Sequence, residues 1–228
     1  MRTLRLLAGL LLTLAVCLAI PAKADTVTSN LGTQNFTAGT KVTTGAFLTA
    51  VAAQPAPFNA FCGSDTASNC SANWTFNYVV PSGDTVTGAT LSLGILDLDS
   101  AAAGNQIASF TLNGVDDLTS TINTVANALD GGTGSPNSFY EVLTIIIPGA
   151  DLADLGGTSA TFALQSSQPG LGILGATSFN GVGLDFSTLS LTVTAGTTNP
   201  PPMPEPSSLA LCLAGVVAAG MAKVLLHR

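Results

Sequence analysis

Asp97, Asp99 and Asn105 are the residues of this sequence whose types and spacing best suit metal chemistry. The two carboxylates are two positions apart, so on a strand they would share a face, and Asn105 follows after a loop of small residues. Calcium binds carboxylate, amide and carbonyl oxygens, so the pattern predicts a calcium site, although its spacing is not that of an EF-hand. The alternative is that these residues end strands and turns and face water.

The composition removes most catalytic mechanisms from the region between residues 25 and 199. His227 is the only histidine, this region contains no arginine, and Lys41 is its one lysine. Ser–His–Asp triads, Cys–His pairs, the usual zinc sites and arginine clamps on phosphate are therefore excluded. Paired carboxylates such as Asp97 and Asp99 are the remaining catalytic alternative, as in a glycoside hydrolase. We expect no enzymatic activity, and calcium is the only cofactor that the residues suggest.

Charge is distributed unevenly along the chain. From Asp25 to Asn199 there are twelve acidic residues and one lysine, a net charge of −11. A protein that binds nucleic acid needs cations to replace the counterions around phosphates, so nucleic acid is excluded as a partner. An acidic surface suits solubility outside a cell or the binding of divalent cations.

Two aromatic residues and two cysteines complete the candidates. Trp74 and Tyr78 lie four positions apart on one face of a predicted strand. They either stack on a sugar ring or belong to the core, and their alternating neighbours favour the core. Cys62 and Cys70 are eight positions apart in a loop rich in Gly, Ser and Asn, and in an exported protein this pair predicts a disulfide.

A series of short predicted strands must position these residues. Alternating or β-branched runs occupy residues 74–80, 85–98, 106–112, 139–147, 160–164 and 189–193, separated by turn residues that include Asn113-Gly114. Only residues 150–155 resemble a helical turn. Many short strands divided by Gly, Asn and Pro predict a mainly β domain over residues 25–199, a β-sandwich of jelly-roll type.

The N-terminal segment has the features of a secretion signal. Two arginines precede an apolar run over residues 6–20. Ala22 and Ala24 supply small residues at the positions that signal peptidase reads, so residues 1–24 are predicted to be a signal helix that is cleaved before Asp25. The alternative is an uncleaved membrane anchor, for which the apolar run is short.

The C-terminal segment combines a proline-rich linker with an apolar helix. Five prolines between residues 200 and 206 exclude helix and central strand, so this stretch is a stiff linker. Residues 207–222 carry no charge, and residues 209–226 can span a membrane if Lys223 snorkels. We therefore predict a single transmembrane helix with a short basic, cytoplasmic tail over residues 207–228.

The order of Pro204-Glu205-Pro206, an apolar helix and a basic end resembles the PEP-CTERM sorting signal of Gram-negative and related bacteria. The resemblance implies that an exosortase, a membrane-embedded Cys peptidase, reads this triplet and releases or transfers the protein to the surface. Segments 86–114 and 183–189 are also similar to the extracellular sandwich domain of many PEP-CTERM proteins, which implies a surface domain.

These features together predict an exported, non-enzymatic protein of the cell surface or extracellular matrix. Signal peptidase and an exosortase are the expected processing partners, and the C-terminal helix is expected to be a transient inner-membrane anchor. The protein is then expected to associate with extracellular polysaccharide, a biofilm or a surface layer. The alternatives are a calcium-dependent carbohydrate-binding or adhesion module and a carboxylate-dependent glycoside hydrolase.

Overall fold

The computed structural model describes residues 24–64, 66–98, 105–129, 139–167 and 179–196. Ala24–Thr194 form one compact unit. The predicted signal up to Lys23, the proline-rich linker, the sorting triplet and the C-terminal helix lie outside the described residues. Within the described ranges, no helix is long and apolar enough to cross a membrane.

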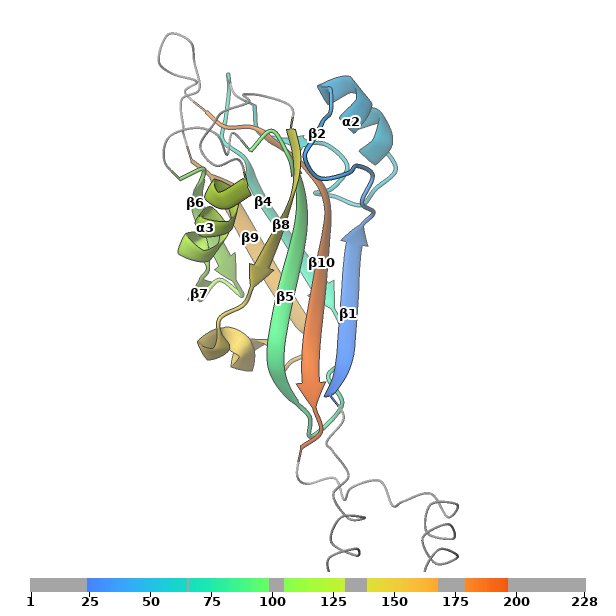
Figure 1. Ribbon diagram of the computed structural model, residues 1–228, viewed down its shortest axis with the longest axis vertical. Helices are drawn as coiled ribbons and strands as arrows, with labels where there is room; N and C mark the ends of the chain where they lie inside the picture. Colours follow the sequence, from blue (N-terminus) through green and yellow to red (C-terminus); the bar gives the residue numbers. More distant parts are fainter. Residues whose placement is uncertain (1–23, 65, 99–104, 130–138, 168–178, 197–228) are drawn as a thin grey trace, which may run out of the picture. The chain divides into compact units, whose positions relative to one another are not determined.

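The unit contains two antiparallel sheets. Their strands are β1 (Ala24–Gly32), β2 (Thr40–Lys41), β3 (Phe61–Cys62), β4 (Ser71–Asn77), β5 (Thr85–Leu96), β6 (Ile107–Leu112), β7 (Asp116–Asp117), β8 (Phe139–Ile146), β9 (Ser159–Ser166) and β10 (Val182–Thr194). The six-stranded sheet has the order β1-β10-β5-β8-β2, with β3 also paired to β10, and the four-stranded sheet has the order β4-β9-β6-β7 (Figure 1). Every connection between consecutive strands of six or more residues crosses from one sheet to the other. The predicted mainly β, two-sheet domain is confirmed.

The main core lies between the two sheets. Strand alternation produces this core. On β5 the side chains of Leu91, Leu93 and Ile95 are fully buried, whereas Thr90 and Ser92 are half-buried. The four-stranded sheet contributes mainly aromatic rings, such as Phe110 and Phe162, whose centroids are 5.8 Å apart. The alternation that predicted the strands therefore also identifies the side that faces the core.

Two α-helices occur where the sequence predicted none. Helix α3 (Thr119–Leu129) packs against β8 and β6 and buries Ile122 and Ala126 in the main core. Its buried Asn123 side chain pairs with the backbone of Ile107 in β6, as a neighbouring strand would. The Asn123 side-chain oxygen accepts from the Ile107 N–H (3.0 Å), and its amide donates to the Ile107 carbonyl (2.8 Å). The predicted helical turn over residues 150–155 is confirmed as the 3-10 helix η1 (Gly149–Leu155).

Helix α2 (Thr44–Val51) lies against the outer side of the six-stranded sheet, near one end of β10 (Figure 1). The Thr43 side chain caps it by accepting from the Ala46 N–H (3.2 Å). A second, smaller core forms beneath it, and this core comprises Val42, Phe47, Val51, Leu96, Tyr140 and Phe186. The outer face of the sheet is thus covered at this end.

Candidate functional site

Of the three predicted calcium ligands, Asp99 lies outside the described residues. Asp97 directly follows β5 and has a left-handed backbone with a φ of 62°. Asn105 is exposed, and its side-chain oxygen accepts from the Asn127 amide (3.3 Å) while its carbonyl accepts from the Ser167 hydroxyl. In the part of the chain that the structure describes, no three His, Cys, Asp or Glu side chains gather as a group that could hold a metal. The calcium site remains a prediction.

Trp74 and Tyr78 both belong to the main core. Trp74 is 4% exposed, and its ring centroid lies 5.7 Å from that of Phe58 and 6.2 Å from that of Phe162. Tyr78 donates its hydroxyl to the Leu155 carbonyl (3.1 Å), and burial raises the pKa of Tyr78 to about 12. Neither ring presents a face to a sugar, so the sugar-stacking alternative is wrong and the core interpretation is correct.

The predicted disulfide between Cys62 and Cys70 is present, with a Cα–Cα distance of 4.7 Å. Cys62 lies in β3 and pairs with Val182 of the six-stranded sheet. Cys70 is fully buried and directly precedes β4 of the four-stranded sheet. The covalent bond therefore joins the two sheets.

The predicted processing sites can be placed only in part. Ala24 and Asp25, on either side of the predicted signal cleavage, are exposed and begin β1 opposite Thr194 and Val193 of β10. Ala22 and the triplet Pro204-Glu205-Pro206 lie outside the described residues.

Asp185 is a fully buried carboxylate at a bulge in β10, and it was not among the predicted site residues. Leu184 pairs with Ile95 and Phe186 pairs with Gly94, so Asp185 is the extra residue between two consecutive pairs. A β-bulge changes the direction of a side chain, and here the carboxylate meets the segments that follow β1 and α2. The signal in the sequence is a lone acidic residue between apolar neighbours on a strand.

Four hydrogen bonds hold this carboxylate. Its Oδ2 accepts from the Asn35 backbone N–H (2.9 Å) and the Tyr140 hydroxyl (2.8 Å), and its Oδ1 accepts from the side-chain amides of Asn35 (2.7 Å) and Gln54 (3.3 Å). A carboxylate has about four acceptor positions, so neutral donors occupy all of them. Burial, with the hydrogen bond to Asp185 and its charge, raises the pKa of Tyr140, which therefore remains a donor. We call Asp185, Asn35, Gln54 and Tyr140 the Asp185 network.

An open depression of about 410 Å³ adjoins the Asp185 network. It is lined by Gly32, Thr33, Asn35, Ala50, Ala53, Gln54 and Pro55. Gln54 turns its polar atoms to the protein, because its side-chain oxygen accepts from the Thr33 N–H (2.6 Å) and its amide donates to the Thr33 carbonyl (3.1 Å). The arrangement fixes two loops to β10, and the lining of the depression combines small apolar side chains with the polar residues Thr33 and Asn35.

A second group of carboxylates lies in β7 and η1. Partial burial, a side-chain hydrogen bond with Asp154 and the charges of Asp154 and Asp151 raise the pKa of Asp116. Asp154 is exposed, and neither Asp116 nor Asp154 lines the depression described above.

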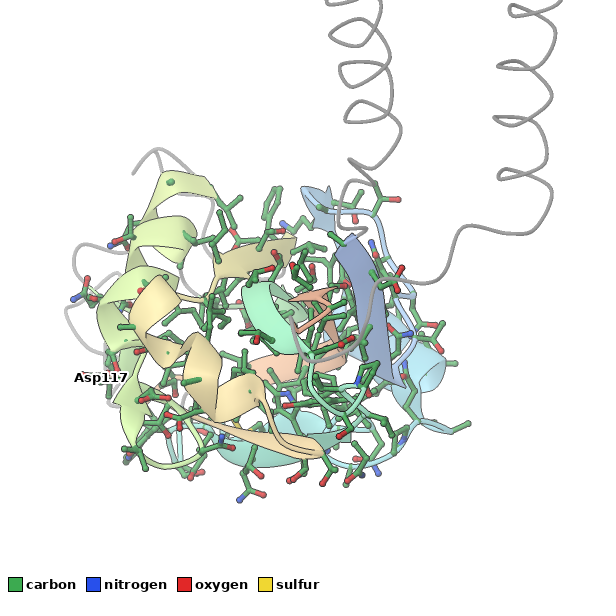
Figure 2. The ribbon with its side chains drawn as sticks, turned by 90° about the horizontal axis from the view of Figure 1, so that it is seen from below. Asp117 is labelled. Carbon is green, nitrogen blue, oxygen red and sulfur yellow. A yellow bond between two sulfur atoms is a disulfide. The ribbon has the colours of Figure 1, made fainter. Side chains whose placement is uncertain are left out.

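Asp117, next in the chain, ends β7 and accepts a hydrogen bond from the first residue of α3. Figure 2 shows it at the periphery of the domain, and its Oδ1 accepts from the Thr119 N–H (2.9 Å). Hydrogen bonds from Thr119 lower the pKa of Asp117, so it is ionised at neutral pH. A carboxylate at this position satisfies a free N–H group and complements the helix dipole.

The part of the outer face of the six-stranded sheet that no described helix or strand covers presents hydroxyl groups, and we call it the Ser/Thr face. It comprises Thr26 and Thr28 of β1, Thr188, Ser190 and Thr192 of β10, Thr90 and Ser92 of β5, and Thr144 of β8. The residues between them, such as Leu91, Leu189 and Leu191, are buried in the main core, so these hydroxyl side chains point away from it. All are exposed or half-buried.

Comparisons with known proteins place the chain in no family. No protein-family model matches the sequence, and neither does any curated protein. Among solved structures, the chain is similar to "BuGH86E322Q in complex with neoagarooctaose" (14% identity, TM-score 0.33) over 57% of this chain and 17% of that one. It is also similar to a family GH115 4-O-methyl-α-glucuronidase with specificity for decorated arabinogalactans (10% identity, TM-score 0.27), over 54% of this chain and 13% of that one. Scores this low do not allow either enzyme's activity or ligand to be assigned to this chain.

Proposed function

We propose that this chain is an exported, non-enzymatic protein that contributes to the cell surface or an extracellular polysaccharide matrix after sorting by an exosortase. The observation that carries the proposal is the Cys62–Cys70 disulfide, because a bond between two sheets of a small domain is typical of proteins that fold in an oxidising compartment. The apolar N-terminal segment supports export independently of the disulfide.

A non-catalytic role is supported by what two of the described carboxylates already do. The carboxylate of Asp185 is fully occupied by hydrogen bonds, and that of Asp117 caps α3. The region from residue 25 to residue 199 also lacks the histidine and arginine that Ser–His–Asp triads and arginine clamps on phosphate require. The domain therefore acts through its surface.

The second candidate is a calcium-dependent adhesion or carbohydrate-binding module. The specific observation in its favour is the left-handed backbone of Asp97 (φ 62°), which directly follows β5. Asp97 also lies two residues before Asp99 in the sequence. Thermal unfolding with calcium and with a chelator tests this candidate. An unchanged melting temperature would reject it.

Sorting is tested by expressing the full chain in a bacterium that has an exosortase and in the same strain without that peptidase. We expect the wild-type chain to be shortened and released from the inner membrane only when the peptidase is present. Glu205→Ala should remain membrane-bound, and Pro201→Ala, in the same linker but outside the triplet, should be processed normally. Alkylation of the exported protein should find Cys62 and Cys70 oxidised.

Two results would contradict the proposal. The first is identical processing of the wild-type chain and Glu205→Ala. The second is a chain that stays in the cytoplasm with both cysteines reduced.

A further inference from the structure

We propose that the Ser/Thr face is a docking surface for a neutral extracellular polysaccharide. The proposal rests on the proposed function, because only an exported chain meets such a polymer. It deepens that function by assigning the contact to one face of the six-stranded sheet and by naming the chemical class of the partner.

The residues of the Ser/Thr face lie in ordered rows across four strands, and two of these rows also include Asn30 of β1 or Ile146 of β8. One row runs from Asn30 through Thr188 and Ser92 to Thr144, and the next from Thr28 through Ser190 and Thr90 to Ile146. A third row pairs Thr26 with Thr192. Neighbouring strands lie about 4.8 Å apart, and residues on one face repeat about every 6.8 Å along a strand. The face is therefore a two-dimensional array of hydroxyl groups held by a rigid backbone.

Hydroxyl side chains match the hydrogen-bonding chemistry of sugars. Each Ser or Thr hydroxyl both donates and accepts, as does each hydroxyl of a pyranose, so the two surfaces can pair in several orientations. Thr188 already donates to the exposed Asn30 side-chain oxygen (2.7 Å) and connects two strands of the array. Thr is β-branched and rotationally restricted, so ordering these side chains on binding loses little entropy.

The absence of charge on the face selects the kind of partner. None of its side chains is ionisable, although the region from residue 25 to residue 199 carries a net charge of −11. An acidic polysaccharide would be repelled by the domain, and a cation or basic protein would bind at carboxylates instead. A protein interface would need an apolar, aromatic centre, and the one large apolar side chain in these rows is Ile146 at their margin. A neutral polymer rich in hydroxyl groups fits all three conditions.

The affinity is expected to depend on polymer length. Each hydroxyl contact replaces a contact with water and contributes little by itself. A long chain that touches several rows, or several copies of the protein, gains by multivalency. Short oligosaccharides should therefore bind weakly, which suits a matrix component better than a receptor for a single sugar.

The test is affinity electrophoresis of the purified full chain through gels that contain dextran, laminarin or hydroxyethylcellulose, with the acidic polymer alginate as a comparison. The triple variant Thr28→Val, Thr90→Val and Thr192→Val removes one hydroxyl from each of three strands with minimal change of shape. The matched control is Thr75→Val with Thr161→Val, which removes a hydroxyl pair (Oγ1–Oγ1 2.8 Å) from the outer face of the four-stranded sheet. We expect the triple variant to bind a neutral polymer about tenfold more weakly, and the control to bind like the wild-type chain.

Retardation by none of the neutral polymers would overturn the proposal, as would equal retardation of the triple variant and the wild-type chain. Stronger retardation by alginate than by every neutral polymer would also overturn it. Failure here is distinguishable from failure of the proposed function, because export and processing are measured separately in cells. An exported, processed chain without retardation rejects the docking surface alone, whereas a reduced cytoplasmic chain rejects the proposed function.

Discussion

At one end of the outer face of the six-stranded sheet, α2 covers Phe186, Tyr140 and Leu96. At the other end, the same strands present Thr and Ser side chains that no described helix or strand covers (Figure 1). On β10, residues 182–187 are all buried. Beyond them, Leu189 and Leu191 are buried, whereas Thr188, Ser190 and Thr192 are half-buried or exposed. One strand therefore passes from a two-sided core to an exposed hydroxyl surface.

The difference between the two ends shows how the sheet separates stability from surface chemistry. The covered end contains the Asp185 network and the smaller core, so its side chains are held from both sides. The open end is held from one side only, and its hydroxyl groups remain available to solvent. Substitutions should therefore change stability at the covered end and binding at the open end.

The largest effect is expected for Asp185→Ala. It removes the acceptor of four hydrogen bonds and leaves the Tyr140 hydroxyl unpaired beneath α2, which should lower the free energy of unfolding by about 3 kcal/mol. Urea unfolding followed by the fluorescence of Trp74, the only tryptophan and a core residue, measures this in the full chain. Ser190→Ala on the same strand at the open end is the control, with an expected change within about 0.5 kcal/mol. Equal stability of the two variants would remove the distinction between the ends.

Loss of the disulfide should come next. Cys62→Ser with Cys70→Ser opens a loop between the two sheets, with a sequence separation of 8, and should lower the free energy of unfolding by about 2–3 kcal/mol. Cys62 pairs with Val182 of β10, and its neighbour Phe61 packs against the smaller core, so the loss again falls at the covered end. Cys212→Ser, in the predicted membrane helix, should leave Trp74 unfolding unchanged. A double variant as stable as the wild-type chain would show that the bond matters little to the fold.

Two glycines on β5 compare the ends within one strand. A Cβ on Gly94 would collide with the Tyr140 hydroxyl and the Phe186 ring, whereas a Cβ on Gly88 would meet Thr192 at an ordinary 3.6 Å. Gly94→Ala should therefore lower the free energy of unfolding by about 1–3 kcal/mol, and Gly88→Ala by less than about 0.5 kcal/mol. The same urea experiment measures both. If Gly94→Ala is tolerated as well as Gly88→Ala, Tyr140 and Phe186 do not pack closely against Gly94.

Tyr140→Phe should have a smaller effect and a distinctive pH dependence. The variant loses one of the four donors to Asp185, at a cost of about 1 kcal/mol at neutral pH. Burial, with the neighbouring Asp185, raises the pKa of folded Tyr140 above its unfolded value of 10.0, so its stabilisation is complete below pH 10 and is lost as the pH rises further. Unfolding measured between pH 8 and 11 should therefore show a shallower alkaline loss for the variant. The same alkaline slope as in the wild-type chain would contradict this role.

Alternation along the chain was sufficient to predict most of the fold. Most of the long strands were predictable because their inward side chains are apolar and their outward side chains are polar, although β1 (Ala24–Gly32) was not predicted. The turn at Asn113-Gly114 was predictable because both residues favour positive φ (54° and 69°). Helices α2 and α3 were not, because their Thr-, Asn- and Gly-containing sequences are poor helix formers that packing against the sheets stabilises.

The Asp185 network could not have been assembled from the sequence. Asn35 and Gln54 contact a residue that follows them by 150 and 131 positions, and no local pattern links segments so far apart. Asp185 itself was recognisable as a lone carboxylate on an apolar strand, but only the bulge shows which way it points. The disulfide was predictable because the secretion signal implies an oxidising compartment and the two cysteines are close together in the sequence.

The smallest expected change in stability is that of the triple variant at the open end, and it decides how a loss of binding by this variant is interpreted. Thr28→Val, Thr90→Val and Thr192→Val keep β-branched side chains on exposed or half-buried strand positions, so the free energy of unfolding should change by less than about 1 kcal/mol in total. Urea unfolding of the triple variant, monitored at Trp74, checks this directly. A large loss of stability would mean that these hydroxyl groups support the sheet itself, as Asp185 does at the covered end. If stability is unchanged while retardation by neutral polysaccharides is lost, folding does not require these hydroxyl groups, and their contribution is to binding.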